Sequence, residues 1–136
     1  MAYDEAIRNI TLTADASLAG YTGVAGTPGS ASPHFGKAQY RFVKITGAKQ
    51  CGLATAAADL VVGVCQSKPQ VAGEAATVSI RGVSRVLAGG PFAAGVKIDT
   101  DATGRAIAAG AGAGIGISVE AATVANELTS VLLRCN

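Results

Sequence analysis

Tryptophan is absent from this sequence, histidine occurs once, and tyrosine and phenylalanine together make up only 4% of its 136 residues. The single histidine, His34, has no recognisable set of partners for a nucleophile–base pair or a zinc site. No pair of carboxylates arranged for acid–base catalysis stands out either. We therefore expect a protein that is not an enzyme and that uses no cofactor and no metal.

Large apolar side chains are also scarce. Apolar residues make up 49% of the chain, but many are alanine, which buries little area per residue. The 18 glycines add an entropic cost to folding. A single domain of this length can form a core, yet we expect the isolated monomer to be only modestly stable. A partner that binds only the folded state would stabilise it.

Two short motifs resemble ligand-binding loops but lack residues that such loops need. Residues 99–104 (DTDATG) resemble the first half of a calcium loop, but Thr103 replaces a carboxylate and the closing glutamate is missing. The glycines of 110–116 are not followed by Lys-Ser or Lys-Thr, and Ile115 stands where a dinucleotide fingerprint needs glycine. We interpret the first motif as a hairpin turn and the second as a loop that leads into a strand.

Cysteine use and the absence of targeting segments indicate where the chain is made. Cys51, Cys65 and Cys135 leave at least one thiol unpaired and match no zinc or redox spacing. Cys65 and Cys135 lie in apolar segments, where cysteine behaves as a small buried hydrophobe. The start of the sequence lacks the apolar core of a signal peptide, and the longest uncharged run (106–119) is too short to span a membrane. We expect a soluble protein made in a reducing compartment.

Alternation of apolar and polar residues is the main structural signal from residue 71 onward. This period of two places alternate side chains on opposite faces of a sheet. Seven or eight short strands separated by glycine-rich turns predict an all-β fold, a small Gly/Ala-rich sandwich or a partly closed barrel. The expected strands are 38–46, 61–66, 75–81, 83–87, 96–99, 105–108, 114–120 and 127–134, with a further short one at 8–13.

Local patterns add expectations about connections. The turn at 101–104 should join strands 96–99 and 105–108 as a hairpin, because Gly104 tolerates a positive φ. The last strand is apolar on both faces at 131–133, which favours a central position. The alanine-rich segment 51–59 is interpreted as a loop or a short helix.

Composition divides the chain into an extended N-terminal arm (1–36) and a β-domain (37–136). The arm is rich in Gly, Ser, Thr, Pro and Ala and lacks the periodicity of a packed element. It nevertheless contains Tyr3, Tyr21 and Phe35. These rings suit an arm that lies on a partner's surface, or they fold back onto the chain's own barrel.

The net charge of +2 is too small to indicate nucleic-acid binding by itself. Its distribution is uneven, because no acidic residue occurs between Asp15 and Asp59. Four basic residues fall in that stretch: Lys37, Arg41, Lys44 and Lys49. They form either a solvated strand face or a contact patch for an acidic partner.

The order of motifs from residue 59 onward adds a resemblance. DLVVGV at 59–64 is followed by AGE at 72–74, VSIRG at 78–82, GVKI at 95–98, DATG at 101–104, GIGISVEA at 114–121 and a last strand at 128–134. This order resembles the tailed-bacteriophage capsid cement, or head decoration, family. The resemblance implies a virion structural protein, made in the host cytoplasm, that binds the major capsid protein on the outer surface of the head and stabilises the shell. It also implies self-association, as a homotrimer or a dimer, with no nucleic-acid or membrane partner.

On this interpretation the contact residues belong to the arm, the basic stretch and one late aromatic. Phe92 follows a Gly-Gly-Pro break and either plugs a subunit interface or belongs to the core. The expected capsid or subunit contacts are Tyr3, Arg8, Tyr21, Phe35, Lys37, Arg41, Lys44 and Phe92.

Two other functions remain open from the residues alone. One is a carbohydrate- or cell-surface-binding β-module of a phage fibre or adhesin, although the chain has few rings to stack on sugars. The other is a nucleic-acid-binding barrel that uses Tyr40 and Phe42 beside the basic stretch, although the net charge is small.

Overall fold

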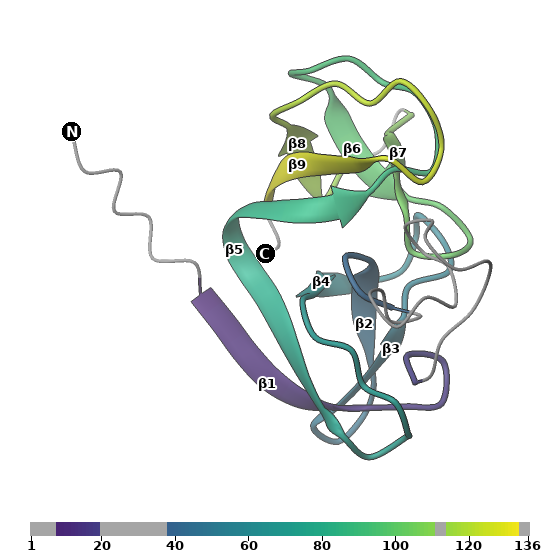
Figure 1. Ribbon diagram of the computed structural model, residues 1–136, viewed down its shortest axis with the longest axis vertical. Coiled ribbons are helices and arrows are strands. Elements are labelled where there is room, and N and C mark those ends of the chain that lie inside the picture. The colour runs from purple at the N-terminus through teal and green to yellow at the C-terminus, as the bar shows by residue number, and fades with distance from the viewer. Residues whose placement is uncertain (1–7, 20–37, 111–113, 134–136) are drawn as a thin grey trace.

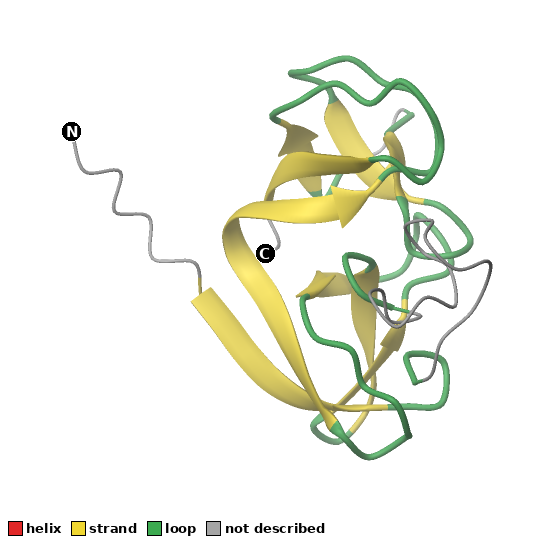
Figure 2. Ribbon diagram, viewed as in Figure 1, coloured by secondary structure: helices red, strands yellow, loops and turns green. Residues whose placement is uncertain are grey.

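The computed structural model describes residues 8–19, 38–110 and 114–133. Within these ranges the chain forms nine β-strands and no helix, which confirms the all-β class (Figure 2). No membrane-spanning helix therefore occurs in this part of the chain. The strands are β1 (Arg8–Ala14), β2 (Phe42–Gly47), β3 (Gln50–Leu53), β4 (Val61–Cys65), β5 (Ala75–Leu87), β6 (Lys97–Thr100), β7 (Ala106–Ala108), β8 (Gly116–Ser118) and β9 (Leu128–Leu133).

Five of these strands close into a barrel. Their order is β1-β3-β2-β4-β5, and β5 pairs back onto β1 in antiparallel register. The barrel also contains one parallel contact, where Thr13 and Ala14 of β1 pair with Gln50 and Cys51 of β3. The sequence predicted a sandwich or a partly closed barrel, and the structure has a closed one.

The long strand β5 belongs to two sheets. Its first half pairs with β1 and β4, whereas its second half pairs with β9 in a sheet of order β5-β9-β8-β6-β7. Figure 1 shows β5 curving out of the barrel and into this second sheet. Gly82, at φ 92°, lies at the point where the strand changes partners. Because this φ favours glycine, the bend depends on that residue.

Two hydrophobic cores follow from this arrangement. The first fills the barrel and includes Val43, Cys65 and Val78. The second is shared by the second sheet and the outer side of β2 and β4, and it includes Phe42 and Val131. Phe42 and Val43 are neighbours in β2 that point to opposite faces, so this strand contributes to both cores.

Several local predictions are confirmed. Antiparallel pairing of β6 with β7 makes the expected hairpin, in which Gly104 has φ 78°. Strand β9 lies between β5 and β8, as its two apolar faces indicated. Cys65 is buried, as is Cys51, and both thiols are free; Cys135 lies outside the described residues.

Three expectations need correction. Cys51 begins no helix, because residues 50–53 form β3, which hydrogen-bonds to both β1 and β2. The expected strands 75–81 and 83–87 are one strand, continuous through Gly82. Residues 8–14, assigned to the arm, are a barrel strand, since Leu12 packs against the barrel core. The β-domain therefore begins before residue 37, while 1–7 and 20–37 lie outside the described residues.

Candidate contact surface

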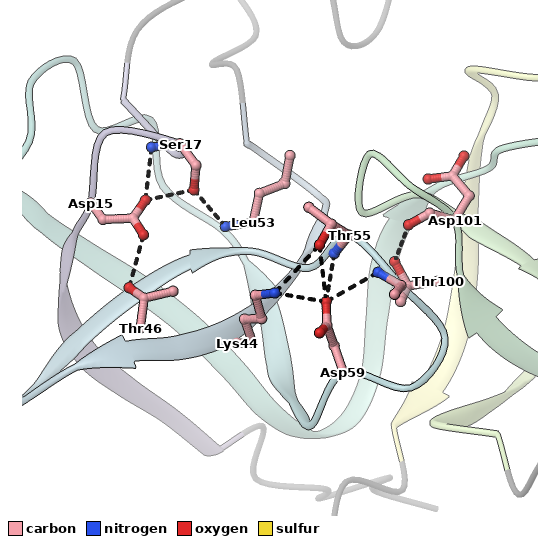
Figure 3. Close-up of polar contacts among 10 residues, drawn as sticks. Asp15, Ser17, Lys44, Thr46, Leu53, Thr55, Asp59, Thr100 and Asp101 are labelled. Carbon is pink, nitrogen blue, oxygen red and sulfur yellow. Dashed lines mark hydrogen bonds and ion pairs between the residues drawn. The ribbon is translucent and has the colours of Figure 1, made fainter.

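Lys44, one of the expected contact residues, is already paired within the chain. It lies in β2 opposite Val61 of β4, and the loop before β4 brings Asp59 beside it. The Lys44 Nζ atom is 2.9 Å from Asp59 Oδ2. The same oxygen accepts the backbone amides of Thr55 at 2.8 Å and Ala56 at 3.0 Å (Figure 3). The amide of Thr55 and the ammonium of Lys44 together lower the pKa of Asp59 to about 2.

Arg41, the second described member of the basic stretch, is held against the β6–β7 turn. Its Nη1 donates to the carbonyl oxygen of Thr103 at 2.8 Å. The Nε atom is buried and has no hydrogen-bond partner among the described residues. Burial, together with the nearby charge of Arg105, lowers the pKa of Arg41. Arg41 thus joins two parts of the fold and offers only part of its side chain to a partner.

The turn that resembled a calcium loop is organised by Asp101. Its Oδ1 accepts the backbone amides of Thr103 at 2.8 Å and Arg105 at 2.9 Å, and its Oδ2 lies 2.8 Å from Arg105 Nε. Burial opposes ionisation, but these contacts lower the pKa of Asp101 overall. Arg105 continues the network to Asn126 Oδ1 at 3.0 Å. No group of three or more His, Cys, Asp and Glu side chains suited to a metal occurs among the described residues.

A third carboxylate, Asp15, fixes the end of β1. Its Oδ1 accepts the amide and hydroxyl of Ser17, and its Oδ2 accepts the hydroxyl of Thr46 at 2.8 Å (Figure 3). Ser17 Oγ in turn accepts the amide of Leu53 at 2.8 Å. Burial opposes ionisation here too, but the hydrogen bonds from Ser17 and Thr46 lower the pKa of Asp15 overall. Asp15, Asp59 and Asp101 therefore each hold a loop in one conformation.

The remaining expected contact residues divide into three groups. Phe92 is 8% exposed and belongs to the second core, where its backbone pairs with that of Ala122. The structure thus favours the core interpretation over a subunit plug. Arg8 opens β1 at a position opposite Arg81 of β5. The other four, Tyr3, Tyr21, Phe35 and Lys37, lie outside the described residues.

The fold leaves three basic residues, which the sequence did not single out, without a compensating charge. Arg81, Arg85 and Lys97 are exposed, and in the described part of the chain the only ion pairs are Lys44–Asp59 and Arg105–Asp101. The signal was present in the alternation of 81–87, which places Arg81 and Arg85 on one face. The alternation identified a strand, but only the register shows which residues of the neighbouring strands lie on the same face.

No protein-family model matches the sequence, and a search among curated proteins finds no relative. Comparison with solved structures does find a similar fold. The crystal structure of the N base of head fiber gp8.5 from bacteriophage phi29 matches with a TM-score of 0.58. The match covers 95% of this chain and 97% of that one, at 14% sequence identity. At this identity the similarity concerns the fold alone.

Proposed function

We propose that this chain is a structural protein of a phage virion, made in the host cytoplasm, that attaches to the outer surface of the head. The observation that carries the proposal is the near end-to-end fold similarity to a part of a phage head fiber. The order of motifs from residue 59 onward supports it independently, because it resembles the head decoration family. Function is inferred here from fold and motif order, so a binding experiment has to test it.

The side-chain chemistry of the loops is consistent with a binding module. Asp15, Asp59 and Asp101 accept hydrogen bonds from the backbone and side chains of their own loops. Loops held in this way lose little conformational freedom when they meet a partner, which lowers the cost of association. The chain would contribute contact area to a larger particle, with no bond-making step.

The more specific role we propose is that of a cement protein. It would bind the major capsid protein, as a homotrimer, and stabilise the shell. Because only the folded module would bind, the many equivalent sites of a shell would also stabilise the module. Linking three copies raises their effective concentration at the shell without any new contact.

Heads that lack the protein, prepared from a phage whose copy of the gene is deleted, provide the test. Purified protein is added to these heads, bound protein is measured by co-sedimentation, and the particles are imaged by cryo-electron microscopy. We expect saturable binding and ordered density on the outer surface. Failure to bind at saturating concentration would show that the chain is not a head protein.

Heating the same particles separates a cement protein from a fibre base. A cement protein should raise the temperature at which the heads release their DNA. If the protein attaches to the heads without changing that temperature, we would conclude that it is a head protein that carries another part, as a fibre base does. Binding to defined glycans on an array, without binding to heads, would instead support the carbohydrate-binding module.

A further inference from the structure

An apolar row crosses the outward face of the second sheet. In β5, Gly82, Ser84 and Val86 are buried, so the residues between them point outward. Val83, 36% exposed, pairs with Leu132 of β9. Leu132 pairs with Ile117 of β8. The row Val83–Leu132–Ile117 therefore spans three adjacent strands and is partly open to solvent.

Positive charge surrounds this row. Arg81 and Arg85 lie two residues to either side of Val83 in β5, and exposed residues alternate with buried ones along 81–85. Lys97 of β6 pairs with Ile117 and ends the row on its far side. All three side chains are exposed, and none forms an ion pair with another described residue. We call this surface the basic sheet face. Its residues are Arg81, Val83, Arg85, Lys97, Ile117 and Leu132.

Two acidic residues lie at its margin. Glu120 follows β8, is exposed, and accepts a hydrogen bond from Ser130 Oγ of β9 at 3.0 Å. Ser130 is the partner of Arg85 in the β5–β9 ladder. Asp99 of β6 lies two residues from Lys97 on the same face and is 8% exposed. The face thus carries three cationic side chains against two carboxylates, and its balance is positive.

We propose that the basic sheet face is the surface by which this protein docks onto an acidic, apolar-centred patch of the shell protein of the head. The inference rests on the proposed function, because it takes the partner to be part of the head. An apolar centre with a charged rim is the usual anatomy of a protein–protein contact. The rim charges would steer the encounter and set its salt dependence, and the apolar row would be buried at the centre.

A second copy of this chain is a poor occupant of the basic sheet face. Self-pairing of the face would bring Arg81, Arg85 and Lys97 against their own counterparts, and like charges across an interface are repulsive. Of the acidic side chains on other described surfaces of a second copy, Asp59 and Asp101 are already ion-paired within their own chain. Within the described ranges every acidic side chain accepts at least one hydrogen bond from its own chain, as for Asp15, Asp59, Glu74, Asp99, Asp101, Glu120 and Glu127.

Nucleic acid also fits the basic sheet face less well than a protein does. Single-stranded nucleic acid is bound by positive grooves that carry aromatic side chains on which bases stack. The centre of this face is aliphatic, formed by Val83, Leu132 and Ile117. A partner with its own apolar side chains matches that centre better.

The test compares two charge-reversed variants for binding to heads that lack the protein. R81E/R85E removes the cations of β5, and K49E/K68E makes the same change in net charge at two lysines outside the second sheet. Circular dichroism and thermal unfolding establish that both variants are folded. We expect R81E/R85E to weaken binding by about tenfold or more and to flatten its dependence on salt, whereas K49E/K68E stays close to wild type.

The apolar centre is tested separately with Val83→Thr, which keeps the β-branched shape but replaces one methyl group with a hydroxyl group. We expect it to weaken binding with little change in salt dependence.

If both R81E/R85E and Val83→Thr bind heads as the wild type does, the docking surface lies elsewhere and the proposed function stands. If the wild type itself fails to bind, both proposals are wrong. Binding of labelled single-stranded DNA that R81E/R85E abolishes, with binding to heads unchanged, would assign the face to nucleic acid.

Discussion

Gly63 of β4 lies directly against Ser79 of β5, so closely that a Cβ atom at position 63 would overlap the Ser79 carbonyl oxygen. The side chain of Val78 is the next neighbour, 2.8 Å from that Cβ position. Strands β4 and β5 share only two paired positions, Val64 with Ser79 and Cys65 with Val78. The absence of a side chain at position 63 is therefore a condition for closing the barrel between these strands.

Gly63→Ala should accordingly destabilise the protein strongly. The obstacle is backbone, which cannot rotate away, so we expect a loss of about 3 kcal/mol in the free energy of unfolding, at the upper end for overpacked sites. Gly90→Ala is the matched control, because no atom lies within 4 Å of its Cβ position. That change should stay within about 0.5 kcal/mol of the wild type. Urea unfolding of both variants measures the difference, and equal stabilities would contradict the close approach.

The fold was predictable from the sequence where the determining signal is local. Residues 101–104 contain a turn with glycine at the position that has positive φ, and the hairpin forms there. The two apolar faces of β9 report burial on both sides, and the strand is central. In contrast, β1 joins the barrel through Leu12 and through pairing with a strand more than sixty residues away. The local pattern predicted a short strand at 8–13, and β1 confirms it, but nothing local shows that this strand pairs into the barrel.

The basic stretch shows a similar limit for the site. In the sequence it is a run without acid that ends at Asp59. In the structure the antiparallel pairing of β2 with β4 brings Asp59 beside Lys44. The acidic residue that ends the run therefore compensates the charge of a lysine in its middle. Arg81, Arg85 and Lys97, which are exposed and have no ion pair among the described residues, lie on β5 and β6, where the sequence shows only an alternating strand. Charge along a chain predicts a surface only after the register of its strands is known.

The Lys44–Asp59 pair predicts a contribution to stability that depends on pH. The pKa of Asp59 is about 2 in the folded protein, below its usual value near 3.8. The carboxylate therefore contributes its full stabilisation above the unfolded pKa, and the contribution is lost as the pH falls toward the folded value. Asp59→Asn should cost about 1 kcal/mol near neutral pH, a modest figure because the pair is partly exposed.

Unfolding by urea, measured across acidic pH for the wild type and Asp59→Asn, checks this sign. The difference in stability between the two proteins should be constant above about pH 5 and shrink as the pH approaches 2. Asp15, Asp101 and Glu127 also have lowered pKa values and lose stabilisation in acid. They affect both proteins equally, so only the difference reports on Asp59. A difference that grows in acid would contradict the assignment.

Phe92 provides a test of the second core. It is 8% exposed and packs with residues such as Val86 and Val131. Phe92→Ala should lower the free energy of unfolding by roughly 3 kcal/mol, as for other large-to-small core changes. Leu60→Ala, at a side chain that is 82% exposed, should change it by less than about 0.5 kcal/mol. If Phe92→Ala leaves the stability of the dilute monomer unchanged but abolishes self-association, Phe92 lies at a subunit interface.

The two buried thiols predict slow chemistry in the folded state. Cys51 and Cys65 are completely buried, and burial raises both pKa values, that of Cys51 to about 11. Since the thiolate is the reactive form, neither residue should react with a thiol reagent at about pH 8 unless the barrel opens.

The measurement uses a Cys135→Ser background, so that only these two thiols are counted. We expect negligible modification of the native protein and two equivalents in denaturant. A further variant with Ala57→Cys, in an exposed loop, should gain one fast-reacting thiol and shows that the reagent is active. Rapid modification of two thiols in the native Cys135→Ser protein would mean that the barrel core around Val43 and Val78 is not closed.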